Sequence, residues 1–298
     1  MSPPRPPSTD LAHAYAYCER LARAHYENFP VASRLLPAAM RPHIAAIYAF
    51  ARLADDMADE GRRPDTARIQ DLERWGARLD RAIAGDADDG PHGEVFVALR
   101  HTIEACLLPV PLFHDLLSAF AQDVTVRRYA TWDDVLDYCR RSANPVGRLV
   151  LRVAGRDRDA LDGASDAVCT ALQLTNFWQD LRIDWDRGRL YVPAAVWRAH
   201  GATEDGLRGD RLPDEWRRAM REAIEYTRAL FDRGREVCDA VPGRLKYELR
   251  ATWLGGARIL DKLEELHYDP YVRRPALSWR DAPGLVWRAI VWPQDSRG

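Results

Sequence analysis

Apolar side chains recur every three or four residues along most of this chain, which is the spacing that one face of a helix produces. No segment alternates apolar and polar residues over the length of a strand, and no Asn-Gly hairpin turn occurs. The sequence therefore predicts an all-α fold. The helix that carries residues 49–60 begins at Pro37 or Pro42, and further helices are predicted over residues 10–28, 65–84, 94–108, 111–126, 132–153, 173–184, 193–200, 213–240 and 244–267.

No internal repeat and no linker divides these helices, so the sequence predicts a single helical bundle over residues 10–276. The Pro-rich N-terminus, residues 1–9, is predicted to be disordered, and a Trp-rich segment follows the bundle at residues 277–298.

The helix over residues 132–153 is predicted to begin with a Thr131 cap that has an acid, Asp134, three residues on. Inside it, Pro145 predicts a kink within the run 144–147, because proline removes a backbone donor and clashes with the preceding turn. Such a kink either opens space for a ligand or is an irregularity of packing, and the sequence leaves both readings open.

Composition narrows the class of protein. With 298 residues and 47% apolar content the chain can bury a substantial core, and a net charge of −2 without a charged block argues against nucleic acid as a partner. Five cysteines without a CxxC pair indicate reduced thiols and a cytoplasmic protein. The N-terminal stretch 1–10 lacks the apolar core of a signal peptide, and no apolar run reaches about 18 residues, so the protein is expected to be soluble or peripheral at the inner face of the membrane.

Candidate chemistry lies in two acidic stretches. In AFARLADDMADE, residues 49–60, Asp55 and Asp59 fall on one helix face, and Arg52 precedes them. In LTNFWQDLRIDWDRG, residues 174–188, Asp180 and Asp184 have the same spacing. Gln173 and Asn176 precede this second pair by a turn or two and extend the same face.

A single pair of aspartates at this spacing is usually part of a solvated helix face. Here, however, both pairs are flanked by apolar residues such as Ile47, Phe50, Phe177 and Trp178, which predicts that the two helices are largely buried. Buried carboxylates need partners, and oxygen ligands of this kind suit Mg²⁺. Two such helices facing an apolar cavity are expected to hold a diphosphate through bridging metals.

Taken together, these motifs resemble the squalene and phytoene synthase family of head-to-head isoprenoid enzymes, over about residues 26–278. The resemblance rests on both aspartate motifs and on the segments around them. These segments are Tyr48 with Arg52, Arg127-Arg-Tyr129, Tyr138-Cys139, Val146-Gly147 and Gly188-Arg-Leu-Tyr-Val-Pro193.

The resemblance implies an isoprenoid-synthase bundle around an apolar cavity, with a prenyl diphosphate substrate and Mg²⁺ as cofactor. It implies roles for specific residues, carried over by position. Asp55, Asp59, Asn176, Asp180 and Asp184 would be metal ligands; Arg52 would contact the diphosphate; Gln173, Tyr268 and Arg273 would bind substrate; and the aromatic side chains Phe29, Tyr48 and Tyr138 would line the tunnel.

Within the family, the stretch 27–33 and the run 138–147 look most like the bacterial hydroxysqualene synthase branch, which ionises presqualene diphosphate and captures the rearranged cation with water. Many condensing members carry cations where this chain has residues 26–28 and Gln179. An enzyme that starts from presqualene diphosphate neutralises one diphosphate and not two, so the loss of these cations fits that branch. Ile183, where relatives often carry an acid, leaves the number of metals open.

Two alternatives remain at the level of sequence. A condensing synthase would join two prenyl diphosphates to make presqualene diphosphate, squalene or phytoene. A non-catalytic bundle that kept the fold is the other alternative, although the four motif aspartates are intact.

The C-terminal segment is a candidate for peripheral membrane contact. Trp279, Trp287 and Trp292 lie there among aliphatic residues, and tryptophan favours the membrane interface. Packing of this segment against the bundle is the competing interpretation.

Overall fold

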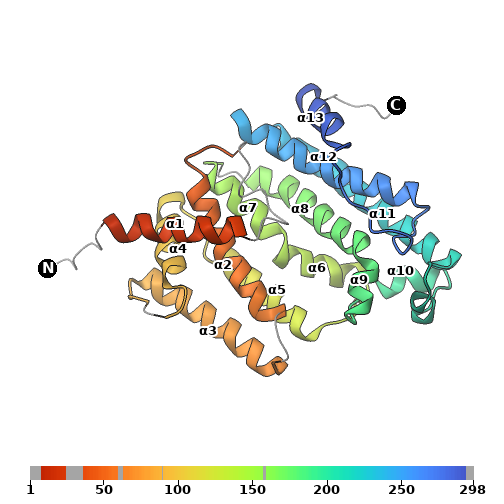
Figure 1. Cartoon of the computed structure of the whole chain (residues 1–298), viewed down its shortest axis with the longest axis horizontal. Coiled ribbons are helices and arrows are strands. Elements are labelled where there is room, and N and C mark those ends of the chain that lie inside the picture. Colours follow the sequence, from red (N-terminus) through yellow and green to blue (C-terminus); the bar gives the residue numbers. More distant parts are fainter. Residues whose placement is uncertain (1–7, 25–35, 60–62, 89, 157–158, 293–298) are drawn as a thin grey trace. The chain divides into compact units, whose positions relative to one another are not determined.

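The computed structural model describes residues 8–24, 36–59, 63–88, 90–156 and 159–292. These ranges are helical with no strand, apart from one isolated bridge between Arg128 and Leu190, which confirms the all-α prediction (Figure 1). The helices are α1 (Ser8–Ala24), α2 (Arg41–Asp59), α3 (Asp65–Ala84), α4 (Gly93–Cys106), α5 (Pro111–Thr125), α6 (Trp132–Ser142), α7 (Asn144–Val153), α8 (Asp159–Gln179), α9 (Leu181–Asp186), α10 (Ala194–Ala199), α11 (Asp214–Gly234), α12 (Gly243–Glu265) and α13 (Ala282–Val291).

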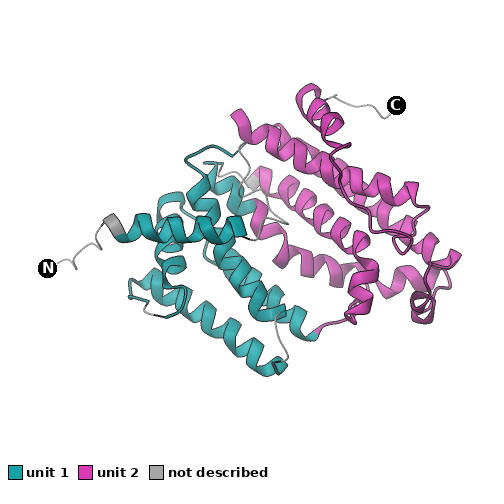
Figure 2. Ribbon diagram, viewed as in Figure 1, with its two compact units in different colours: residues 1–125, 148–157 teal, residues 126–147, 158–298 magenta. Residues whose placement is uncertain are grey.

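The chain divides into two compact units (Figure 2). Unit 1 contains residues 1–125 and 148–157, and unit 2 contains residues 126–147 and 158–298. Helices α1 to α5 belong to unit 1, α6 and α8 to α13 belong to unit 2, and α7 begins in unit 2 and ends in unit 1.

Unit 1 is built around four aromatic side chains from four of its helices. Phe50 of α2 lies 5.8 Å from Trp75 of α3 and 5.6 Å from Phe113 of α5, measured between ring centroids. Phe96 of α4 lies 4.5 Å from Trp75, and all four rings are fully buried. The indole nitrogen of Trp75 donates to the carbonyl of Phe50. This core fixes α2, the helix that carries the first acidic motif.

Unit 2 is organised by the contact of α8 with α11. Gly234 allows the close approach, since a Cβ atom there would lie 2.5 Å from the carbonyl oxygen of Ala164. Farther along the pair, the indole nitrogen of the buried Trp178 donates to the Thr227 hydroxyl at 2.8 Å. Helix α8 leads directly into the second acidic motif, so this contact positions that motif within the unit.

The helix predicted over residues 132–153 begins as expected but is divided in two. Thr131 and Asp134 form the predicted capping box at its start. The division falls at Ala143, between α6 and α7, just before Pro145, whose missing N–H and bulky ring are the physical cause. Next to it, Gly147 packs on α8, where a Cβ atom would lie 2.5 Å from the sulfur of Cys169. Gly147 therefore allows the start of α7 to pack closely on α8.

Candidate active site

The first acidic motif lies on the last two turns of α2. Arg52 approaches two of its carboxylates, with Nη2 at 2.5 Å from Asp56 Oδ1 and Nη1 at 3.4 Å from Asp55 Oδ2. The Arg52 guanidinium therefore pairs more closely with the carboxylate of Asp56 than with that of Asp55. Its Nε is buried and has no hydrogen-bond partner among the described residues, so a donor remains for a ligand oxygen. Asp59, one turn after Asp55, is exposed.

Negative charge accumulates around Asp55. Burial, together with the neighbouring carboxylates of Asp59, Asp123 and Asp56, raises the pKa of Asp55 to about 6, while the Arg52 guanidinium opposes the shift. A carboxylate in these surroundings is costly to ionise unless a cation joins it. The arrangement on α2 is therefore that of a cation-binding group.

Asp123 on α5 is the part of this cluster that the sequence analysis missed. Its carboxylate is buried, at 8% exposure, and its charge acts on Asp55. A signal was present, because Asp123 follows Leu116 by seven positions and Ala119 by four, which puts an acid on the apolar stripe of α5.

Tyr48 lies one turn before Arg52 on α2 and is half-buried. Burial raises the pKa of its hydroxyl, and the nearby Arg52 guanidinium opposes this shift. The structure thus brings together Tyr48, Arg52, Asp55 and Asp59 on one side of α2. Phe29, which is predicted to bind substrate, lies outside the described residues.

The second acidic motif spans the junction of α8 and α9. Helical hydrogen bonds continue through the junction, with the amide of Asp180 donating to the carbonyl of Asn176 and the amide of Asp184 donating to that of Asp180. Asn176, Asp180 and Asp184 therefore follow one another at single-turn intervals, as predicted from their spacing. Gln173 lies one turn earlier and is half-buried, while Asn176 is exposed.

Asp180 is held by an arginine that the sequence analysis did not select. The guanidinium of Arg274 makes a two-pronged ion pair with Asp180, with Nη2 at 3.1 Å from Oδ2. The neighbouring Gln179 donates its amide to the carbonyl of Pro275 at 2.5 Å. The segment after α12 is thereby fastened to the second motif. Arg273, the residue predicted to bind substrate, is exposed beside this contact.

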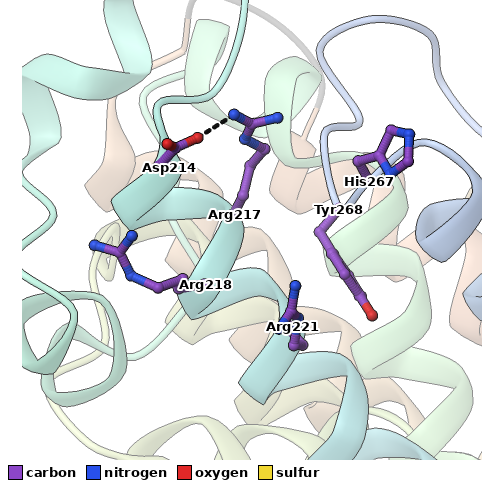
Figure 3. Close-up of a pocket in the computed structure, with 6 residues that line it drawn as sticks. All are labelled: Asp214, Arg217, Arg218, Arg221, His267 and Tyr268. Atoms are coloured by element: carbon purple, nitrogen blue, oxygen red, sulfur yellow. Dashed lines mark hydrogen bonds and ion pairs between the residues drawn. The ribbon is translucent and has the colours of Figure 1, made fainter.

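Tyr268 lies in a pocket of about 400 Å³ (Figure 3). The chain takes a left-handed turn here after α12, with φ angles of 54° at His267 and 62° at Tyr268. The guanidinium of Arg221 lies 4.9 Å from the Tyr268 ring. The remaining lining residues come from the first turns of α11 and are Asp214, Arg217 and Arg218. Arg217 is paired with Asp214, and Arg218 lies 3.5 Å from Glu215, so these two charges are partly balanced within unit 2.

Tyr138 belongs to a buried aromatic cluster of unit 2, formed by Tyr129, Tyr138, Phe177 and Tyr191. Phe177 stacks on Tyr191 with ring centroids 3.7 Å apart, and Tyr138 lies 6.0 Å from each of them. Tyr129 lies 5.9 Å from Tyr138. All four side chains are less than 10% exposed. The cluster therefore places Tyr138 in the buried core of unit 2.

Oxygen donors of the kind that Mg²⁺ prefers are present in both motifs. Within the part of the chain that the structure describes, however, no three His, Cys, Asp or Glu side chains gather closely enough to hold a metal by themselves. Asp55 fits a cation nonetheless, because the surrounding carboxylates raise its pKa and the Arg52 guanidinium lies closer to Asp56 than to Asp55.

A profile of the squalene/phytoene synthase family matches residues 22–281. The chain belongs to this family. Its members are isoprenoid synthases, and the resemblance carried by the two aspartate motifs is confirmed.

Known squalene/phytoene synthases support the same fold over most of the chain. The hydroxysqualene synthase of Zymomonas mobilis is 40% identical over 210 residues, which is 70% of this chain and 68% of that protein. The 15-cis-phytoene synthase of Synechococcus elongatus is 28% identical and covers 98% of this chain and 99% of its own length. Among solved structures, the squalene synthase HpnC of Alicyclobacillus acidocaldarius has a TM-score of 0.81 and 41% identity, covering 88% of this chain and 97% of that chain.

Proposed function

We propose that this isoprenoid synthase converts presqualene diphosphate and water to hydroxysqualene and inorganic diphosphate. The observation that carries the proposal is the similarity to a hydroxysqualene synthase, at 40% identity over 210 residues. In the proposed reaction the C–O bond to diphosphate breaks, the cyclopropylcarbinyl cation rearranges, and a water oxygen forms the new C–O bond with loss of one proton.

We further propose that Asp55, Asp59, Asn176, Asp180 and Asp184 are Mg²⁺ ligands, with Gln173 in support. Bound there, Mg²⁺ would neutralise the diphosphate and stabilise it as a leaving group. The raised pKa of Asp55 supports this assignment, since a carboxylate with three acidic neighbours gains from a cation.

The chain's own residues supply the remaining chemistry of the proposal. Arg52 donates from its guanidinium to diphosphate oxygens, and charge-assisted bonds of this type strengthen as the leaving group gains charge. Tyr48 and the buried ring of Tyr138 bind the chain of the substrate. Aromatic faces stabilise a carbocation by about 0.5–2 kcal/mol each, and the apolar surroundings delay capture by water.

The substrate-contact roles of Phe29, Tyr268 and Arg273 remain proposals from the motif. For the diphosphate contact after α12, Arg274 is the stronger candidate, because it is the arginine that reaches the second motif at Asp180.

A condensing reaction is the second candidate. It is favoured by the phytoene synthase relative that covers 98% of this chain, a longer match than the hydroxysqualene synthase gives. In that case the substrate would be two molecules of a prenyl diphosphate, and no water would enter the product.

The two candidates separate in one experiment. Purified protein is incubated with Mg²⁺ and either presqualene diphosphate or farnesyl diphosphate, in water enriched in ¹⁸O, and the products are identified by mass spectrometry. We expect presqualene diphosphate to give hydroxysqualene with one labelled oxygen. Efficient turnover of farnesyl diphosphate, with presqualene diphosphate left unchanged, would overturn the proposal in favour of the condensing reaction.

A further inference from the structure

The C-terminal helix of unit 2 exposes a set of large apolar side chains. Trp279 is 79% exposed, and on α13 Trp287 is 66%, Val286 59%, Ile290 57% and Val291 51% exposed. Val286 and Ile290 are four residues apart, as are Trp287 and Val291, so the helical four form one continuous stripe. These five side chains are called the apolar surface below.

The opposite side of α13 is fastened to the rest of unit 2, where α13 packs against α12 (Figure 1). Trp292 is buried, and its indole nitrogen donates to Asp239 Oδ2 at 3.0 Å. Arg250 donates to the carbonyl of the buried Ala289 at 3.1 Å, and the Arg235 guanidinium lies 4.2 Å from the Trp292 ring. The helix is therefore held in place, and its apolar surface is presented outward as a fixed feature.

The charges around the apolar surface are mainly positive. Arg273, Arg280 and Arg288 are exposed. Asp281 is the one acid between residues 272 and 292. Its carboxylate is already paired with Arg258 at 3.1 Å and Lys262 at 3.0 Å. A partner that covers this surface thus meets apolar side chains together with exposed arginines, and within residues 272–292 the single acid is already paired.

We propose that the apolar surface docks on an anionic lipid bilayer, with α13 lying in the plane of the interface. Ten residues of helix extend about 15 Å, half of the hydrocarbon core, so α13 is too short to span it. None of the described helices has both the length and the apolar character to cross a bilayer. Exposed tryptophan and aliphatic side chains suit the boundary between headgroups and acyl chains, and the arginines suit anionic headgroups.

A second copy of the chain fits this surface less well. In a two-fold dimer the patch faces a copy of itself, so a surface whose exposed charges are arginines would meet another surface of the same sign. Like charges brought together in this way oppose association. An anionic bilayer has no such conflict.

The test is flotation of the full chain with vesicles of phosphatidylcholine alone, or of phosphatidylcholine mixed with phosphatidylglycerol. It uses no substrate, so its outcome is independent of the proposed reaction. We expect binding to the mixed vesicles. The double variant Trp287→Ser/Ile290→Ser should lower the partition coefficient about tenfold for each side chain, because full burial of such a side chain is worth at least that factor.

Three further variants sharpen the test. Trp279→Ser lies outside the helix and should weaken binding with the fold of α13 unchanged. Arg280→Gln/Arg288→Gln should weaken binding to the mixed vesicles about fivefold per arginine and leave the weaker binding to neutral vesicles unchanged. Leu107→Ser is the matched control, since Leu107 is 85% exposed but belongs to unit 1. This control should bind as the unchanged chain does.

Equal flotation of the unchanged chain and Trp287→Ser/Ile290→Ser, with melting temperatures that show both to be folded, would overturn the proposal. So would the absence of flotation together with a dimer, detected by light scattering, that the same double variant dissociates. That second result would assign the apolar surface to self-association.

Discussion

Replacing Asp55 with asparagine should stabilise the metal-free protein at neutral pH. Burial and three neighbouring carboxylates raise the pKa of Asp55 from 3.8 to about 6. A carboxyl group whose pKa is raised on folding destabilises the folded protein when it is ionised. The stability that the protonated form provides is therefore lost as the pH rises from about 4 to about 6. Asparagine keeps the shape of the side chain and removes the charge.

The size of the effect follows from the shift. A change from 3.8 to about 6 corresponds at most to about 3 kcal/mol of unfolding free energy. The Asp55 side chain keeps 39% of its surface exposed, and solvent screening reduces the effect to about 1–2 kcal/mol. For domains of this size the melting temperature should therefore rise by about 2–8 °C.

The assay is thermal unfolding followed by circular dichroism in the presence of a chelator, at about pH 7.5 and about pH 4.5. The gain from Asp55→Asn should be largest at the higher pH and mostly absent at the lower one. Asp56→Asn is the matched control, because Asp56 is paired with Arg52 at 2.5 Å and its loss should bring no gain. A melting temperature that falls in Asp55→Asn at pH 7.5, or a gain that is equal at both pH values, would show that Asp55 does not carry an unfavourable charge in the folded protein.

The remaining predictions concern unit 2. Arg274→Gln removes the ion pair with the first aspartate of the second motif and should lower kcat/KM at least about tenfold in a steady-state assay, whereas the neighbouring Arg273→Gln should have the smaller effect. A smaller loss in Arg274→Gln than in Arg273→Gln would reverse this assignment. Gly147→Ala places a methyl group 2.5 Å from the sulfur of Cys169 and should cost about 1–3 kcal/mol of unfolding free energy, measured by urea denaturation. Unchanged stability of this variant would show that α8 can shift near Cys169 to accommodate the added methyl group. Trp292→Ala should loosen α13 and raise amide hydrogen exchange across residues 282–291, while equal exchange would show that other contacts hold this helix.

The helices and the two acidic faces were predictable because their signals are local. The stripe of apolar residues that contains Trp75 places α3 within a residue of its observed bounds, and Asp180 and Asp184 follow each other by one turn as their spacing predicts. Thr131 and Asp134 also form the predicted capping box. In each case the interacting groups are within four residues of one another, so the regular geometry of a helix turn is enough to place them side by side.

Residues that come together from distant parts of the chain were not predictable in the same way. Asp123 acts on Asp55 from a different helix, and Arg274 reaches Asp180 across 94 residues of sequence. The sequence motif predicted Arg273 as the contact. The path of the chain after α12 instead brings the next residue, Arg274, to the carboxylate of Asp180. Such pairings depend on packing, which the periodicity of a single chain does not encode.

We propose that both acidic motifs bind the same diphosphate through Mg²⁺. Isothermal titration of inorganic pyrophosphate in the presence of Mg²⁺ tests it in the unchanged chain, in Asp55→Asn, in Asp180→Asn and in the double variant. We predict that each single substitution removes most of the binding free energy and that the double variant binds no more weakly than the weaker single variant. Retention of full affinity by either single variant, or losses that simply add, would contradict the claim.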